Sequence, residues 1–144
     1  MSDIKGTYHN SVIMNKIKAI FNGELKNAII RAMQRKNTFG KNWLCVNIND
    51  FVANFTPNPI RENIGNKIKF IGNDKKYCIT ADKTGGYLRL EDYQYFLKTG
   101  KHLYLDINGN DVRNYTDENG KQHGRKKSDF NAITHFKILH REDM

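Results

Sequence analysis

Cysteine, proline and tryptophan are scarce in this sequence, with two, two and one residues among 144. So few cysteines exclude a disulfide-rich scaffold, and no CxxC metal motif is present. Cys45 and Cys78 lie far apart in apolar, strand-like segments. This placement favours buried free thiols and leaves one disulfide as the alternative.

Long apolar runs are also absent. No stretch of about eighteen or more apolar residues occurs, so we expect no transmembrane helix and no stable membrane insertion. The first residues lack the apolar core and the small-residue cleavage site of a signal peptide, so we expect none.

Several catalytic and metal-binding motifs are missing as well. The sequence has no HExxH, no adjacent histidine pair, no acidic cluster ending in ExK, no nucleophile elbow and no dinucleotide fingerprint. Gly85-Gly86 is too short for a glycine-rich phosphate loop. We therefore predict no metal site. A metal-dependent nuclease stays open as a rival hypothesis, because the chain has histidines that can serve as ligands: His9, His102, His123, His135 and His140.

Acidic residues are outnumbered by basic ones, fifteen to twenty-four, which gives a net charge of +9. A small chain this basic suits a polyanionic partner, and nucleic acid is the commonest polyanion. The alternative is that the charge only keeps the protein soluble.

The order of the predicted elements indicates one domain, residues 1–144, of the α+β class. Apolar residues recur at spacings of three and four from residue 13 to 33, which predicts two helices or one bent helix. Thr56-Pro57-Asn58-Pro59 ends any helix and divides a helical lobe (1–56) from a sheet lobe (57–144) that carries the site. We expect the N-terminal helices to pack on a C-terminal antiparallel sheet.

Alternation of apolar and polar residues predicts the strands. A short strand at 43–48 is followed by a helical turn that Asp50 caps and that runs through Phe55. A long polar loop is expected over 116–128. The other predicted strands cover residues 67–71, 76–82, 87–91, 102–107 and 133–139.

Two of these strands place chemically useful side chains on one face. Successive side chains of a strand point to opposite faces. Burial of Leu88 and Leu90 would leave Tyr87, Arg89 and Glu91 on an open face. Burial of Phe136 and Ile138 would likewise expose His135 and Lys137.

This set of side chains suits metal-free cleavage of RNA. The reaction needs a base, an acid and cationic donors at the phosphate. We predict His135 as the acid or base and Arg89 at the phosphate, with Asp82 orienting a catalytic residue. Alternatively, His135 is structural and Arg89 pairs with Glu91 or Asp106. The predicted RNA-binding residues are Tyr87, Tyr104, His102, Lys121, His123, Arg125 and Lys137.

Four short motifs resemble the C-terminal toxin modules of bacterial polymorphic toxins, which include contact-dependent inhibition and Rhs proteins. The motifs are Ala81-Asp82-x-x-x-Gly86-Tyr87-Leu88-Arg89-Leu90, Tyr104-Leu105-Asp106-Ile107-Asn108-Gly109, Gly124-Arg125 and Thr134-His135-Phe136-Lys137-Ile138. The resemblance covers about residues 75–144 and leaves the helical half uncovered.

The resemblance implies a ribonuclease with the fold of the barnase, EndoU, colicin and RelE group. It implies that His135 and Thr134 act at the cut and that Arg89 holds the phosphate. Lys83 is included with the catalytic residues, although the family gives it no defined role. A cognate immunity protein is implied, and elongation factor Tu is a partner of some relatives that cut tRNA. The module would belong to a larger secreted or surface effector and act in the cytoplasm of a target bacterium.

The sequence thus predicts a metal-independent endoribonuclease toxin that needs no cofactor and cleaves tRNA. Two rival functions remain. One is a metal-dependent deoxyribonuclease toxin, which EDTA would silence. The other is a basic RNA-binding domain that never cleaves its ligand.

Overall fold

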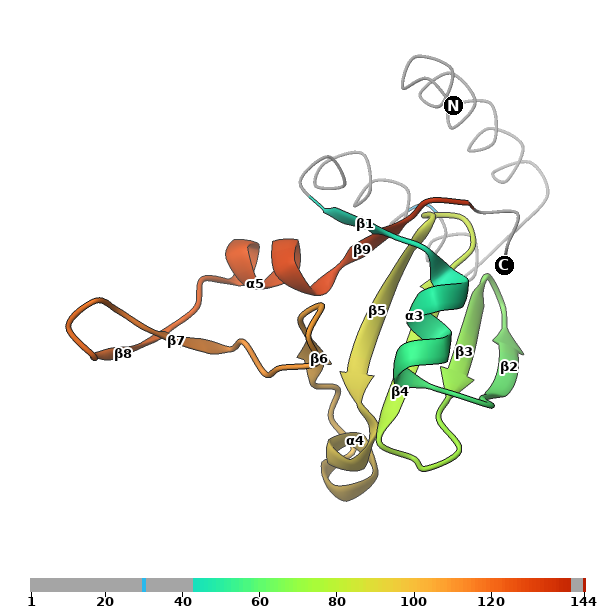
Figure 1. Cartoon of the computed structure of the whole chain (residues 1–144), viewed down its shortest axis with the longest axis horizontal. Coiled ribbons are helices and arrows are strands. Elements are labelled where there is room, and N and C mark those ends of the chain that lie inside the picture. The colour runs from blue at the N-terminus through green and yellow to red at the C-terminus, as the bar shows by residue number, and fades with distance from the viewer. Residues whose placement is uncertain (1–29, 31–42, 141–143) are drawn as a thin grey trace, which may run out of the picture.

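The computed structural model describes residues 30, 43–140 and 144 (Figure 1). The described residues form an α+β fold, which confirms the predicted class. The helices expected over residues 13–33 lie outside the described residues, apart from Ile30. The elements follow in the order β1 (Leu44–Val46), α3 (Ile48–Phe55), β2 (Ile60–Ile64), β3 (Lys67–Ile71), β4 (Tyr77–Asp82), β5 (Tyr87–Asp92), α4 (Tyr93–Thr99), β6 (Tyr104–Leu105), β7 (Asn114–Thr116), β8 (Gln122–Gly124), α5 (Lys127–Thr134) and β9 (Phe136–Ile138).

A seven-stranded sheet forms the body of the protein. Its order is β1-β9-β5-β4-β3-β2, with β6 paired to β5. All neighbours are antiparallel except β1 and β9, which pair in parallel. The strands within residues 57–144 therefore pair antiparallel, as predicted, and the sheet becomes mixed where β1 joins it. The cause is that β9 lies between β1 and β5, so the first and last described strands become neighbours.

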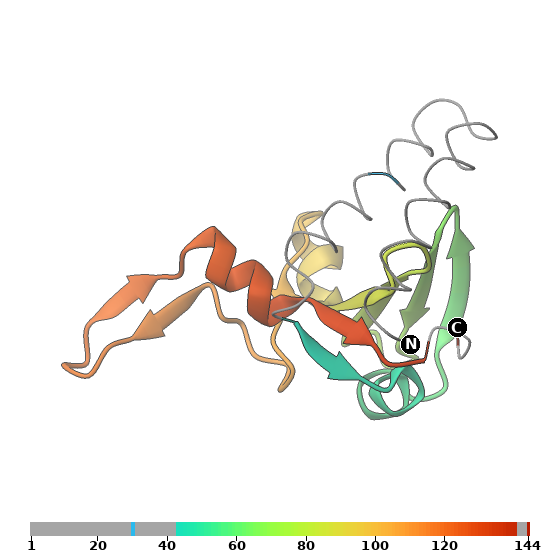
Figure 2. The same cartoon turned by 90° about the horizontal axis from the view of Figure 1, so that it is seen from above.

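The hydrophobic core lies between this sheet and α3, which crosses one face of it (Figures 1 and 2). The register places Leu88 next to Ala81 and Phe136, and all three are fully buried. Helix α3 contributes Ile48 and Phe51 to the same cluster. None of the helices in the described part of the chain has the length and apolar character needed to span a membrane.

Helix α3 begins one turn earlier than the sequence predicted. Asn47 is its N-cap, and the Asn47 side chain accepts a hydrogen bond of 3.1 Å from the backbone N–H of Asp50. Asp50 therefore lies in the first turn, where the positive end of the helix dipole stabilises a carboxylate. The helix ends at Phe55, as predicted, before the two prolines.

The segment before β9 is the main difference between expectation and structure. Residues 127–134 form α5, so the strand expected over 133–139 is limited to Phe136–Ile138. Ile133 and Thr134 are β-branched and were read as strand residues. In the structure the Thr134 hydroxyl donates to the Phe130 carbonyl, four residues earlier, at 2.8 Å. This local bond belongs to the last turn of the helix.

Two other expectations needed correction. The strand expected over 102–107 is limited to Tyr104–Leu105, and Ile107 is exposed. The long loop expected over 116–128 is instead the second half of the β7–β8 hairpin and the start of α5. The edge strand β2 was not predicted, because its residues are all exposed and show no apolar alternation.

Both cysteines are free thiols. Cys78 is fully buried, whereas Cys45 is exposed, which corrects the expectation that both are buried. Burial, together with the nearby Glu91 carboxylate, raises the pKa of the Cys78 thiol to about 12.

A thiol reagent at neutral pH is expected to modify Cys45 and leave Cys78 unmodified in the folded protein. The reason is that the thiolate is the reacting species, and Cys78 is both inaccessible and protonated. Mass spectrometry of the labelled peptides measures the result, and both cysteines should react once denaturant is added. Equal labelling of the two in the folded protein would contradict the burial of Cys78.

Candidate active site

The face of the sheet opposite α3 carries the polar side chains of β5. Alternation along this strand puts Tyr87, Arg89 and Glu91 on that face, as the sequence predicted. The face is not open, however. Tyr87 and Glu91 are buried and Arg89 is half-buried.

His135 lies in the interior, so its predicted place on an open face was wrong. It follows the last residue of α5 and is only 2% exposed. Its ring stacks on Trp43 at 4.8 Å between centroids and lies 5.3 Å from the ring of Tyr87. Its Nδ1 donates to the Asn131 carbonyl at 2.7 Å. The end of α5, which the sequence did not predict, turns this imidazole inward.

Arg89 is held by Thr134 and Tyr104. Its Nη2 donates to the Thr134 hydroxyl at 3.1 Å, and its Nε donates to the Thr134 carbonyl at 3.4 Å. The guanidinium carbon lies 3.4 Å from the centre of the Tyr104 ring, which is a cation–π contact. Thr134 is fully buried, and its hydroxyl and carbonyl hold the Arg89 side chain.

His102 and Glu91 form the second part of this cluster. His102 Nδ1 lies 2.6 Å from Glu91 Oε2. The Glu91 side chain is 3% exposed and the His102 side chain 45% exposed. A buried carboxylate needs a hydrogen-bond partner, and this imidazole supplies one. Because Nδ1 is used by Glu91, a proton exchanged with a substrate would pass through Nε2.

The local chain path explains why His102 returns to Glu91. Asp92 caps α4 by accepting a hydrogen bond of 3.0 Å from the backbone N–H of Tyr95. Gly100 ends the helix at a φ of 72°, a left-handed conformation that glycine adopts at little cost. The chain then reverses, and the N–H of Asp92 donates to the Leu103 carbonyl at 2.9 Å.

Two planar side chains stack on the His102 ring. Phe96 of α4 stacks on it with centroids 4.9 Å apart and an interplanar angle of 11°. Tyr104 of β6 lies 5.8 Å from it at 13°. Since Arg89 contacts Tyr104, the guanidinium and the imidazole belong to one continuous stack. We call Arg89, Glu91, Phe96, His102 and Tyr104 the histidine cluster.

The other predicted residues lie elsewhere. Asp82 organises the turn after β4, where its Oδ1 accepts hydrogen bonds from the Gly85 N–H at 2.7 Å and from Asn66 Nδ2 at 3.2 Å. Lys83 is exposed in this turn. Lys137 is half-buried on β9, opposite Tyr87. The predicted RNA-binding residues of the former loop, Lys121, His123 and Arg125, lie in or next to the β7–β8 hairpin.

The sequence did not predict two features of the cluster. One is that Glu91 pairs with a histidine, and the other is that Phe96 belongs to it. The signal for Glu91 was its position in the alternation of β5, which placed it on the face of Arg89. The turn that returns His102 to it involves α4, and the sequence of that segment was ambiguous.

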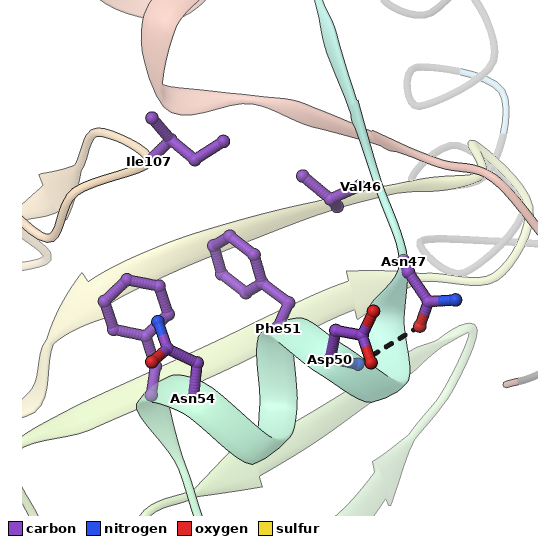
Figure 3. A pocket seen from close by; sticks show the side chains of 7 residues that line it. Val46, Asn47, Asp50, Phe51, Asn54 and Ile107 are labelled. Atoms are coloured by element: carbon purple, nitrogen blue, oxygen red, sulfur yellow. Dashed lines mark hydrogen bonds between the residues drawn. The ribbon is translucent and has the colours of Figure 1, made fainter.

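A cavity of about 310 Å³ lies beside α3, away from the residues of this cluster, none of which lines it (Figure 3). It is lined by Val46, Asn47, Ile107 and four residues of α3: Asp50, Phe51, Asn54 and Phe55. Of the residues that the structure describes, Asp50 is the one charged group that lines it, and no histidine or cationic side chain stands beside that carboxylate. Among the described residues, no group of three or more histidine, cysteine or acidic side chains is placed to hold a metal.

Comparisons with protein-family models, curated proteins and solved structures found no match.

Proposed function

We propose that this chain is a metal-independent endoribonuclease, with His102 in the role that the sequence assigned to His135. The observation that supports it is the contact of 2.6 Å between the half-exposed His102 imidazole and the buried Glu91 carboxylate. Arg89 supplies positive charge in the same stack. The net charge of +9 supports a polyanionic substrate.

In the proposed reaction, His102 Nε2 takes the proton of a ribose 2′-hydroxyl. The 2′-oxygen then forms a bond to phosphorus, and the bond from phosphorus to the 5′-oxygen breaks. The leaving oxygen takes a proton from water. Glu91 stabilises the imidazolium that forms, and Arg89 stabilises the negative charge at the phosphate.

The stack supports this role because it fixes the plane of the imidazole. Phe96 and Tyr104 both stack on the ring, and the Glu91 carboxylate fixes its rotation through Nδ1. A proton-transfer group held in one orientation loses less entropy when the reaction occurs.

The toxin family suggested by the sequence supplies the wider proposal. We propose that the chain acts as the toxin module of a larger effector in the cytoplasm of a target bacterium, with tRNA as its substrate. A cognate immunity protein would block it, and the basic net charge supports an acidic partner. Elongation factor Tu is proposed as a host partner on the resemblance alone.

Incubation of the purified protein with total cellular RNA tests the proposed reaction. We expect discrete fragments with 2′,3′-cyclic phosphate and 5′-hydroxyl ends, formed equally with EDTA and with added Mg²⁺. Mapping of the ends identifies the RNA and the position of the cut.

Two results would contradict the proposal. Cleavage that EDTA abolishes, of DNA in particular, would favour the metal-dependent deoxyribonuclease. Salt-dependent RNA binding without any cleavage would favour the non-catalytic RNA-binding domain.

A further inference from the structure

The β7–β8 hairpin is an arm that projects from the body of the protein (Figures 1 and 2). Its strands pair only with each other and form a two-stranded sheet separate from the seven-stranded one. Tyr115 lies directly opposite His123 in the register, between the pairs Asn114–Gly124 and Thr116–Gln122. An arm of this kind buries little apolar surface, so its sequence is not explained by a core.

The two faces of the arm differ in chemistry. Alternation places Tyr115, Lys121, His123 and Arg125 on one side, which we call the aromatic face. The contacts confirm the arrangement: Tyr115 and His123 stack with centroids 5.3 Å apart, and the Arg125 guanidinium lies 5.3 Å from the Tyr115 ring. The opposite face carries small neutral side chains at Asn114, Thr116, Gln122 and Gly124.

Hydrogen bonds fix the side chains of the aromatic face, and the face is still accessible to a ligand. His123 Nε2 lies 2.6 Å from Asp117 Oδ2, and Arg125 Nε donates to the Val112 carbonyl at 2.8 Å. Hydrogen bonding from His123 lowers the pKa of the Asp117 carboxyl. Tyr115 is nevertheless 44% exposed. Planar groups fixed in this way lose little conformational freedom when they bind a ligand.

The charge of the arm indicates a polyanion. Basic side chains outnumber acidic ones over residues 114–127, where Lys121, Arg125, Lys126 and Lys127 stand against Asp117 and Glu118. Exposed aromatic rings beside arginine are the usual platform for unpaired bases, whereas lysines neutralise the phosphates. An acidic protein would match the charge but would not need the stacked rings.

We propose that the aromatic face of the arm binds single-stranded RNA at a position separate from the histidine cluster. This inference rests on the proposed function only in taking RNA as the substrate. The arm would hold the strand, and the cluster would cut it.

Binding of a labelled single-stranded oligoribonucleotide of about twenty nucleotides tests the arm, measured in the His102→Ala background so that cleavage is slow during the measurement. Tyr115→Ala is expected to weaken binding by about 5- to 150-fold, the range for loss of one stacked base. Lys121→Ala should weaken it less and lower the salt dependence by about one phosphate contact.

Matched controls distinguish the aromatic face from a general effect on the hairpin. Tyr115→Phe keeps the ring and should bind like the parent. Gln122→Ala should also bind within about two-fold of it, because alternation places this side chain on the face opposite the aromatic rings.

The proposal is wrong if Tyr115→Ala binds the oligonucleotide as tightly as Tyr115→Phe. It is also wrong if Gln122→Ala loses as much affinity for the oligonucleotide as Tyr115→Ala. A further contrary result would be that Tyr115→Ala and Lys121→Ala keep their affinity for RNA and lose affinity for an acidic protein. Failure of the wild-type protein to cleave any RNA would overturn the proposed function and leave the binding result standing, so the two can be told apart.

Discussion

Replacement of His102 by alanine is expected to reduce RNA cleavage by about 10²- to 10⁴-fold, the usual contribution of a positioned general base. The fold should persist, because the His102 side chain is 45% exposed. Glu91→Gln should also lower the rate, since an amide can donate to Nδ1 and favour the wrong tautomer. Initial rates on a defined oligoribonucleotide measure both effects, and circular dichroism checks the fold.

His135 offers a matched control histidine for this experiment. Its ring is buried against Trp43, so His135→Phe keeps a planar, apolar group in the same place. We expect this variant to cleave RNA within about ten-fold of the wild type, although loss of the bond to Asn131 should cost about 1 kcal/mol of stability. A fully active His102→Ala variant together with an inactive His135→Phe variant would reverse the assignment.

Replacement of Phe136 by alanine is expected to lower the free energy of unfolding by about 3–5 kcal/mol. Phe136 is fully buried and its ring lies 5.4 Å from that of Phe51, so its loss leaves a cavity between α3 and the sheet. Urea unfolding followed by tryptophan fluorescence measures the change.

Leu139 provides the comparison for this prediction. It follows the same strand but is 55% exposed, so Leu139→Ala should change the unfolding free energy by no more than about 0.5 kcal/mol. Equal losses in the two variants would mean that β9 does not pack as described.

The strands that the sequence predicted best are those that contribute apolar side chains to the core. Three strands, β3, β4 and β5, appear within one residue of their expected ends, because each buries one face against α3. The segment 127–134 could not be recognised in the same way, since its β-branched residues Ile133 and Thr134 are common in strands.

The site could be predicted only in part. Alternation was sufficient to place Arg89 and Glu91 on one face, because it depends on local geometry alone. The pairing of Glu91 with His102 depends on how α4 and the glycine after it reverse the chain. The burial of His135 depends on Trp43, which lies more than ninety residues earlier in the sequence. Contacts between residues so far apart in the sequence produce no local sequence pattern from which they could be predicted.

The position of β9 has a consequence for how the chain is made. In the described residues, β1 joins the sheet only through β9, and β9 itself bridges β1 to β5. Within the described part of the chain, strand β1 therefore gains its pairing strand only when residues 136–138 have left the ribosome, about ninety residues after β1 itself is synthesised. During translation the nascent sheet carries an unfinished edge at β5, and closing that edge is a late event in folding.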